Sequence, residues 1–219
     1  MKKFRTLLTS LIVLLCTAVS AHDFEVDGIY YRIIGSSKLN VQVTYRGYSY
    51  TDYSDEYSGS VVIPEKVTYN GKEYPVTSIR EYTFYNCSGL TSITIPNSVT
   101  DIGSAAFNDC SSLKNLIIED GEGTLVLREN SETFSGIGEG LFYDCPIESL
   151  YIGRNLYYSP YEYDGYSPFF NLKNLSDVTI GDSVTSIGHY IFTGCSGLTS
   201  VTIPNSVTSI GWYAFYGCI

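Results

Sequence analysis

Residues 90–103 read LTSITIPNSVTDIG, and residues 198–211 read LTSVTIPNSVTSIG. The two stretches differ at only two positions, where Ile93 becomes Val201 and Asp101 becomes Ser209. Self-similarity of this kind is typical of a repeat architecture, in which every copy meets the same kind of neighbour. The spacing between copies therefore determines the expected fold.

Each copy contains a phenylalanine, and these phenylalanines lie 23 residues apart where the chain carries no insertion, as from Phe84 to Phe107. A cysteine follows three residues later in every copy except one. An isoleucine precedes the phenylalanine by five residues, with Asp164 as the exception. The three rows are Phe84, Phe107, Phe142, Phe169, Phe192 and Phe215; Cys87, Cys110, Cys145, Leu172, Cys195 and Cys218; and Ile79, Ile102, Ile137, Ile187 and Ile210.

A strand of pattern L-x-x-I-x-I follows the cysteine position in successive copies, as at residues 90–95, and the third copy is one residue short. Side chains alternate along a strand, so Ile93 and Ile95 are expected to point inward and Thr94 outward. Pro96 ends the strand because it cannot donate the next ladder hydrogen bond. One such unit cannot bury its apolar face alone. We therefore predict a β-rich leucine-rich-repeat solenoid of about 23-residue repeats, with short strands and 3-10 or single-turn helical segments between them.

The pattern V-T-S-I-G-x-x-A-F-x-x-C-S-x-L-T-S-V-T-I-P-x-S over residues 76–219 resembles the BspA-type leucine-rich repeat family of bacterial surface and secreted proteins. The resemblance implies a cell-surface or secreted protein with adhesin-like binding to a protein partner, such as extracellular matrix or another cell surface. It also implies that the protein is not an enzyme. The resemblance names no ligand.

The chain is expected to consist of three segments. Residues 1–21 are typical of a cleavable signal peptide, because Lys2, Lys3 and Arg5 precede an apolar run that ends in small residues. A buried N-terminal helix is the competing interpretation. Residues 22–75 carry two hairpin turn pairs and predict an N-terminal β-rich cap, and residues 76–219 form the repeats. The turn pairs are Asp27-Gly28 and Asn70-Gly71.

The chain is acidic. Its formal net charge is −10, and removal of the three leader cations changes the balance from 13 minus 23 to 10 minus 23, which is −13. Nucleic acids and anionic lipids bind chiefly through Lys and Arg, so neither is an expected partner. No apolar run after residue 21 is long enough to cross a bilayer, which predicts no transmembrane segment after signal cleavage.

Two copies carry insertions, near residues 119–135 and 154–168. In the first, the sequence TLVL is expected to form a strand of its own. The second is rich in tyrosine, which suits recognition because it brings large area at low entropic cost. One of these tyrosines, Tyr161, falls in the row that Val76 and Val99 occupy, which also favours a core position.

The outward position between the two strand isoleucines is threonine in most copies but Ile117 and Tyr151 beside the insertions. An apolar pair on a solvent face predicts a binding patch, and the competing interpretation is that the insertions fold back over it. The candidate partner-binding residues are Ile117, Tyr151, Tyr157, Tyr158, Tyr163 and Tyr166. A glycan is a further candidate partner of the tyrosines.

No catalytic, cofactor or metal site is expected. After residue 21 the chain has two histidines, His22 and His189, and neither belongs to a defensible catalytic set. The cysteines lack the clustered spacing of metal ligands. Their slot also accepts Leu172, which favours buried free thiols, although five cysteines in a secreted chain leave disulfides as the alternative.

Two hypotheses for function follow. The first is a secreted or surface-attached protein that binds a protein partner, and the second is a structural spacer module of a longer surface protein, with no ligand of its own. Ile219 directly follows Cys218, before the strand that covers the preceding unit elsewhere. We therefore expect the natural product to continue, or another chain to cover this end.

Overall fold

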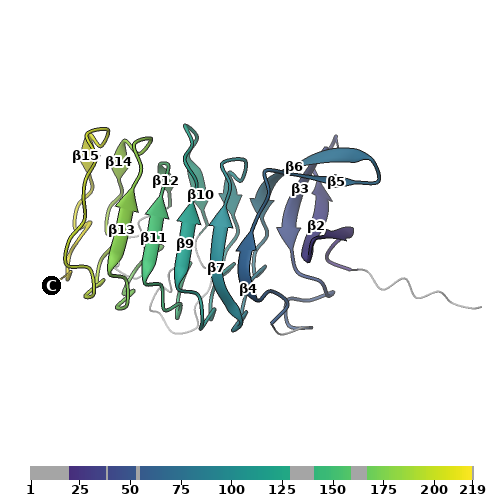
Figure 1. Cartoon of the computed structure of the whole chain (residues 1–219), viewed down its shortest axis with the longest axis horizontal. Helices are drawn as coiled ribbons and strands as arrows, with labels where there is room; N and C mark the ends of the chain where they lie inside the picture. The colour runs from purple at the N-terminus through teal and green to yellow at the C-terminus, as the bar shows by residue number, and fades with distance from the viewer. Residues whose placement is uncertain (1–19, 38, 53–54, 129–140, 159–166, 219) are drawn as a thin grey trace, which may run out of the picture.

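The structure is a computed structural model and describes residues 20–37, 39–52, 55–128, 141–158 and 167–218. Within these ranges the chain forms strands and turns and no helix. The repeats lie side by side along the long axis of the molecule, and each adds strands to its neighbour (Figure 1).

One sheet consists of four of the predicted L-x-x-I-x-I strands together with β4, while the predicted strand at residues 198–203 forms only a single bridge, from Thr202 to Thr179. Its strands are all parallel and follow the order β13-β11-β9-β7-β4. Equivalent residues of successive repeats are paired, so that Thr94 lies opposite Ile117, Ile117 opposite Tyr151 and Tyr151 opposite Thr179. The repeats are therefore in register. The bounds are β4 (Gly59–Val62), β7 (Leu90–Ile95), β9 (Asn115–Ile118), β11 (Ser149–Ile152) and β13 (Asp177–Ile180).

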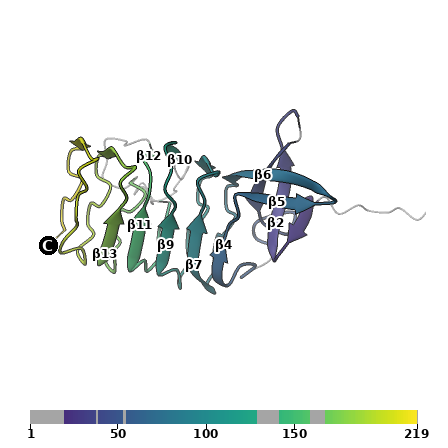
Figure 2. The ribbon, with the colours of Figure 1, turned by 45° about the horizontal axis from the view of Figure 1, so that its top comes forward.

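A second sheet contains shorter strands of the repeats together with the N-terminal strands. Its order is β1-β2-β3-β6-β8-β10-β12, and β5 pairs with β6 to form a ribbon at the N-terminal end of the stack, next to β2 (Figure 2). The bounds are β1 (Phe24–Val26), β2 (Ile29–Ile34), β3 (Asn40–Thr44), β5 (Lys66–Tyr69), β6 (Lys72–Ile79), β8 (Asp101–Ile102), β10 (Leu125–Leu127) and β12 (Leu156–Tyr157). The strand expected in TLVL is thus confirmed as β10.

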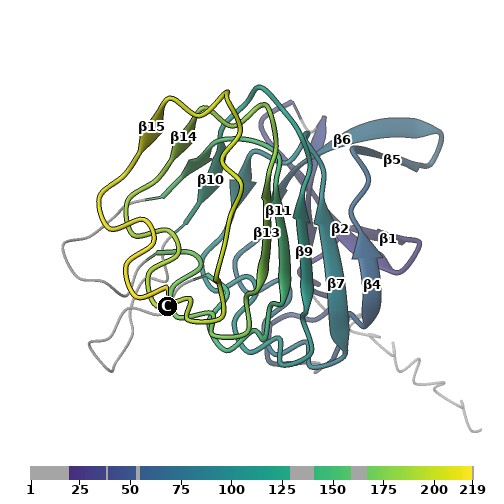
Figure 3. The ribbon, with the colours of Figure 1, turned by 60° about the vertical axis from the view of Figure 1, so that its left-hand side comes forward.

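The last two repeats continue this side of the molecule as a separate pair, β14 (Ser186–Ile187) and β15 (Ser209–Ile210). No strand pairing joins β12 to β14 in the described residues, and the Asn155 side chain instead bonds to the backbone at the start of β14. Its amide oxygen accepts from the backbone N–H groups of Thr185 and Ser186 at 2.9 and 3.1 Å. Figure 3 shows β7, β9, β11 and β13 on one side of the stack and β10, β14 and β15 on the other.

The six phenylalanines form a continuous column between the two sheets. Five of them are almost fully buried, and Phe215 in the last repeat is half-buried. Neighbouring rings are stacked, from Phe84 on Phe107 with centroids 5.0 Å apart to Phe192 on Phe215 at 5.3 Å. The column confirms that like residues lie over like, because rings scattered through the fold would not stack in this way.

Tyr57 closes the N-terminal end of this column. Its ring packs on Phe84 with centroids 4.6 Å apart, and the residue is only 2% exposed. The hydroxyl donates to the backbone carbonyl of Thr44 at 2.6 Å and accepts from the N–H of Tyr30 at 3.2 Å. A polar tip buried this deeply needs both partners, so Tyr57 fastens the N-terminal strands to the first repeat.

The segments around the phenylalanines are turns, and the expected helical segments are not formed in the described residues. The residue two positions after each phenylalanine has positive φ, as in Asn86 (55°), Asp109 (62°) and Gly217 (74°). Tyr82, Ala105, Tyr190 and Tyr213, each two positions before a phenylalanine, also have positive φ. A right-handed helical turn needs negative φ, so left-handed residues at both places prevent it.

These turns satisfy their backbone donors in two ways. Alternate N–H groups bond to the next repeat, as from Phe84 to the carbonyl of Ala106 at 2.8 Å. The N–H groups between them close turns within the repeat, as from Cys87 to the carbonyl of Phe84 at 3.1 Å. A buried backbone donor without a partner is costly, and in the first repeat this alternation gives a partner to every N–H of residues 82–87.

The five cysteines of the described residues are free thiols, and four of them are buried. Each thiol from the second repeat onward donates to the carbonyl of the phenylalanine in the preceding repeat, as Cys110 does to Phe84 at 3.0 Å. Burial raises the pKa of Cys87 and of Cys195 to about 12. The thiols therefore act as small core groups that also bridge neighbouring repeats.

The row of buried isoleucines contains two unexpected members. Leu127 pairs with Ile102, so β10 supplies the row residue that was assigned to Ile137. Tyr158 follows Tyr157, which pairs with Val126, and so takes the next place in the row beside Leu127. Ile137 and Tyr161, to which the sequence pattern gave row positions, lie outside the described residues, as do residues 129–135 and 159–166 of the two insertions.

Phe107→Ala should lower the free energy of unfolding by about 3 to 5 kcal/mol, because the ring is fully buried between two stacked neighbours. Phe192→Ala should cost a similar amount, and Phe215→Ala less, since that ring is half-buried. Thr94→Ser is the control and should stay within about 0.5 kcal/mol. Urea unfolding followed by circular dichroism measures all four. A loss below about 1 kcal/mol for Phe107→Ala would contradict the column.

The cysteines make a second prediction about the folded protein. Iodoacetamide at pH 8 should modify Cys218 well before Cys87, Cys110, Cys145 and Cys195, because those four are buried and reactivity requires an accessible thiolate. Peptide mass spectrometry locates the label at each position. All five should react in 6 M guanidinium chloride, and labelling of Cys195 in the native protein at the rate of Cys218 would count against the buried row.

Candidate functional site

The outward face of the five-stranded sheet is the candidate site. One row of side chains crosses every strand in register, and it comprises Val62, Thr94, Ile117, Tyr151, Thr179 and Thr202. Neighbouring strands lie about 4.8 Å apart, so the row extends over about 24 Å. We refer to these six residues as the outer row. Because β7, β9 and β11 are each paired on both sides, the central part of the outer row is a preorganised surface.

The apolar part of the outer row is accessible to solvent. Val62 is 61% exposed and Ile117 is 39% exposed, whereas the inward residues of the same strands are buried. Tyr151 is half-buried beside Ile117. The sheet therefore exposes aliphatic and aromatic side chains at positions where other repeats carry a threonine, such as Thr94 and Thr179.

Tyr151 is fixed by a hydrogen bond to the preceding repeat. Its hydroxyl donates to a carboxylate oxygen of Asp120 at 2.7 Å. The bond to Asp120 raises the pKa of Tyr151, with burial and the negative charges of Asp120 and Asp182 adding to the effect. Gly181 makes room for the pair, since a Cβ there would lie 2.7 Å from the carboxylate and 2.8 Å from the hydroxyl.

Polar and charged groups surround the outer row. A second outward row on the same strands carries Ser60, Ser92, Asn115, Ser149 and Asp177. At the strand beginnings, Lys114 and Glu148 form an exposed ion pair at 2.8 Å. An apolar centre with a polar border is the usual composition of a protein interface.

The structure brings only two of the six predicted partner-binding residues together. Ile117 and Tyr151 are adjacent in the outer row. Tyr157 is 62% exposed, but it lies in β12 of the other sheet and does not share their face. Tyr163 and Tyr166 lie outside the described residues.

Tyr158 is a correction, because the structure places it in the core and it is only 8% exposed. Its hydroxyl donates to the backbone carbonyl of His189 at 2.7 Å, and it lies over Gly188, where a Cβ would collide with the ring. Burial raises the pKa of this phenol. The apolar row accepts a tyrosine here because its one polar atom has a partner.

Sequence reasoning left two residues beside this face out of the predicted site. Val62 extends the outer row toward the N-terminus, and its signal was the V-V-I-P of residues 61–64, which matches the repeat strand. Arg154 is buried to 1% exposure and donates to the carbonyls of Asn97 and Pro96 at 2.7 and 2.8 Å. It ties the end of β11 to the end of β7 from within, and burial lowers its pKa.

The described residues offer little support for a catalytic, metal-binding or membrane-spanning role. His189 accepts the N–H of Trp212 through its Nδ1 at 2.8 Å and packs edge-on against the Trp212 ring, which is a structural role. No group of three or more potential metal ligands occurs there. The searched residues also include no helix with the length and apolar character needed to span a membrane.

Comparison with known proteins identifies the class. A family model described as the BspA type leucine rich repeat region, in 6 copies, matches residues 58–128, 77–167 and 164–219. No curated protein matches the chain. Two solved structures share the fold at 19% identity. The T. pallidum leucine-rich repeat protein TpLRR has a TM-score of 0.50 over 89% of this chain and 88% of that one, and the pneumococcal vaccine antigen PcpA has a TM-score of 0.55 over 89% of this chain and 47% of that one.

A leucine rich cell surface protein from Faecalibacterium prausnitzii is similar at 26% identity, with TM-score 0.46 over 89% of this chain and 52% of that one. The chain thus spans about half the length of this protein and of PcpA. Fold and neighbours together define a leucine-rich repeat protein. The chain belongs to the BspA-type leucine-rich repeat family.

Asp120→Asn should lower the pKa of Tyr151, because the carboxylate that opposes ionisation of the phenol is removed while the hydrogen-bond acceptor is kept. Carbon-13 NMR of tyrosine Cζ, titrated from pH 8 to 12, resolves the change, and Tyr151→Phe assigns the signal. Glu148→Gln is the matched control and should leave the titration unchanged. A Tyr151 signal that titrates alike in both variants would show that the pair does not persist in solution.

Proposed function

We propose that this chain is a protein-interaction module displayed outside a bacterial cell, and that the outer row contacts the partner. The observation that supports it is the in-register pair of Ile117 and Tyr151 at the centre of a rigid sheet face. The family and the fold point to interaction or surface modules in general. Adhesin-like binding is the specific form that we propose.

The chemistry of the face indicates the kind of partner. Aromatic and aliphatic groups in the middle of a polar border commonly supply most of an interface's binding energy. The surrounding charges are mostly carboxylates, from Asp120, Asp177 and Asp182, and the chain carries a net charge of −10. A partner with an apolar patch bordered by Lys or Arg would complement this surface.

The same proposal covers the architecture and the location. We infer that the two sheets and the turns form a β-solenoid, that residues 22–75 cap its N-terminal end, and that residues 1–21 are removed on export. The pairing of β4 with β7 and the contact of Tyr57 with Phe84 support a cap continuous with the repeats. A neighbour described as a cell surface protein is consistent with a surface location.

The competing hypothesis is a spacer module that binds nothing itself. It predicts that the outer row can change freely as long as the sheet is preserved. The fixed position of Tyr151, held by Asp120 and admitted by Gly181, favours binding, because a spacer gains nothing from orienting an accessible ring. An enzymatic role is not proposed, since proteins of this family and fold are generally not enzymes.

The double variant Ile117→Ala with Tyr151→Ala should weaken partner binding by at least about tenfold, because removal of two central interface residues commonly costs more than 1 kcal/mol each. The measurement is surface plasmon resonance of the intact protein on immobilised extracellular matrix proteins and bacterial surface extracts. The melting temperature of the variant should stay near that of the parent, as both side chains point away from the core.

Thr179→Ala with Thr202→Ala is the matched control, since it changes two residues of the same row farther along the sheet. It should reduce binding much less. Equal binding by the parent and by the Ile117 and Tyr151 double variant, for every partner that the parent binds, would favour the spacer hypothesis.

A further inference from the structure

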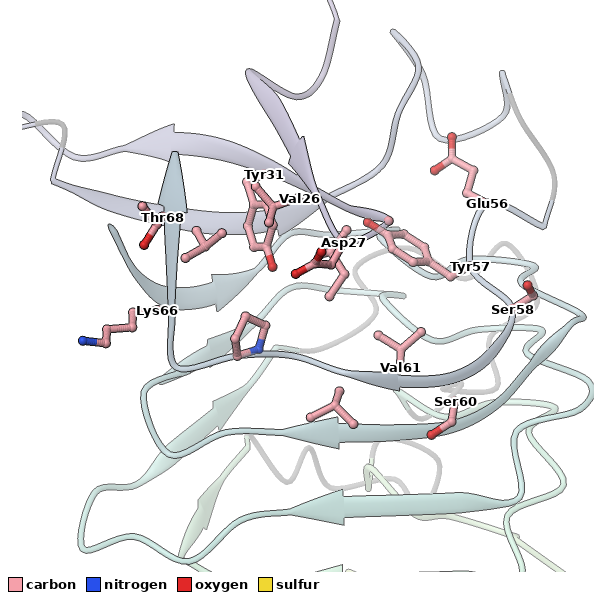
Figure 4. A pocket seen from close by; sticks show the side chains of 15 residues that line it. Val26, Asp27, Tyr31, Glu56, Tyr57, Ser58, Ser60, Val61, Lys66 and Thr68 are labelled. Carbon is pink, nitrogen blue, oxygen red and sulfur yellow. The ribbon is translucent and has the colours of Figure 1, made fainter. Parts of the chain in front are cut away.

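A groove runs along the free edge of the five-stranded sheet, at the Val62 end of the outer row. It is a cavity of about 670 Å³ between β4 and the turn that joins β1 to β2 (Figure 4). Residues from β4, from the β1–β2 turn and from β5 line it, among them Asp27, Ser60, Val62 and Lys66. This volume falls within the range of about 300–1,000 Å³ found for ligand sites.

β4 offers the groove unpaired backbone groups. In the described ranges this strand is the last of its sheet and pairs only with β7. The N–H groups of Gly59 and Ile63 point to β7, where they bond to carbonyls at 2.8 and 3.1 Å. Because hydrogen-bonding direction alternates along a strand, the N–H and C=O groups of Ser60 and Val62 point the opposite way. That direction is the groove.

An exposed edge with unpaired groups can accept a further strand. Natural sheets often protect such edges with a proline or with an inward-pointing charge, and β4 carries neither within Gly59–Val62. Pro64 follows only after the strand has ended. The edge therefore remains able to form a ladder over the length of β4.

The charges of the groove select the kind of strand. Its lining, all within the described residues, includes two carboxylates, Asp27 and Glu56, and one cation, Lys66. Lys66 is already paired with Glu73 at 2.8 Å, so its charge is compensated. Asp27 is exposed at the tip of the β1–β2 turn, above β4 in Figure 4. The Glu56 carboxylate accepts from the backbone N–H of Arg46 at 3.0 and 3.1 Å, so Asp27 is the carboxylate that faces whatever enters the groove.

We propose that this groove binds an extended peptide segment of a partner protein by strand addition to β4, with a Lys or Arg of that segment facing Asp27. The bound segment donates to and accepts from Ser60 and Val62 as a sixth strand of the sheet. This site shares Val62 with the outer row but does not involve Ile117 or Tyr151, and it would serve a second, basic partner segment.

The test begins with a library of random seven-residue peptides displayed on phage and selected against the intact protein. Enriched peptides should carry Lys or Arg next to β-branched residues, and synthetic copies should bind in fluorescence polarisation. A copy that is N-methylated at alternate residues should bind about tenfold more weakly, because the acceptors of β4 lose their donors. Absence of enrichment, or equal binding of the methylated copy, would overturn the proposal.

Variants of the protein locate the site. Val62→Pro removes one outward N–H and should weaken binding about tenfold, whereas Val62→Thr keeps that N–H and should bind within about twofold of the parent. Asp27→Asn should weaken binding about threefold at low salt and reduce its salt dependence. Asn tolerates the positive φ of 51° at this position, so the turn is preserved. Melting temperatures confirm that each variant folds.

Two further outcomes decide between occupants. The Ile117→Ala and Tyr151→Ala double variant should bind the selected peptides like the parent, which separates this site from the outer row. Sedimentation equilibrium tests for a second copy of the chain on β4. A dimer that Val62→Pro dissolves and Val62→Thr keeps would assign the edge to self-association, and would overturn the proposal, as would equal peptide binding by Val62→Pro and Val62→Thr.

Discussion

Pairing in register between successive repeats is the constraint on which this structure depends. Neighbouring repeats share hydrogen bonds along one parallel sheet, along the shorter strands of the opposite side and along the turns, where Phe84 bonds to Ala106. The stacked phenylalanine rings fill the space that these bonds enclose. A shift of one residue in any strand would turn its isoleucines to solvent and break the ring column. Equivalent residues of successive repeats therefore share one environment. An exposed position whose residue type differs from that of its equivalents is a candidate for a functional role.

This constraint explains how much of the fold the sequence reveals. A row of like residues reports a shared environment, so the phenylalanines, the thiols and the strand isoleucines could be assigned to the core without a structure. The turns were less readable. Asn, Asp or Gly precedes each repeat cysteine and also Leu172. These residue types favour the left-handed conformation, which excludes a helical turn. Their recurrence at the same position of every repeat is what makes this indication of a turn specific. Counting five residues back from Phe142 also failed to locate this repeat's member of the isoleucine row, because an insertion can lie on either side of that member. Only strand pairing identifies it as Leu127.

The candidate site was predictable to the same degree. Alternation along the strand placed Ile117 and Tyr151 on one face, and the register makes them neighbours. The bond from Tyr151 to Asp120 was not predictable, because it joins residues 31 apart in the sequence across an insertion-bearing repeat. Tyr158 shows the opposite failure. A tyrosine in a tyrosine-rich, loop-like stretch suggests a surface residue, yet the glycine at position 188 leaves room for the ring and a backbone carbonyl satisfies its hydroxyl. Single contacts of this kind decide burial, and they come from other repeats.

The outer row and the β4 groove are linked by the sheet itself. Val62 belongs to both, since its side chain opens the outer row and its backbone forms the free edge. A strand added at β4 would extend the sheet by one position, and alternate side chains of the added segment would continue the outer row beyond Val62. A partner that places one segment in the groove and a second surface on Ile117 and Tyr151 would bind both sites within one rigid frame. The second contact would then form at a high effective concentration, so two weak sites on this sheet could together hold a partner firmly.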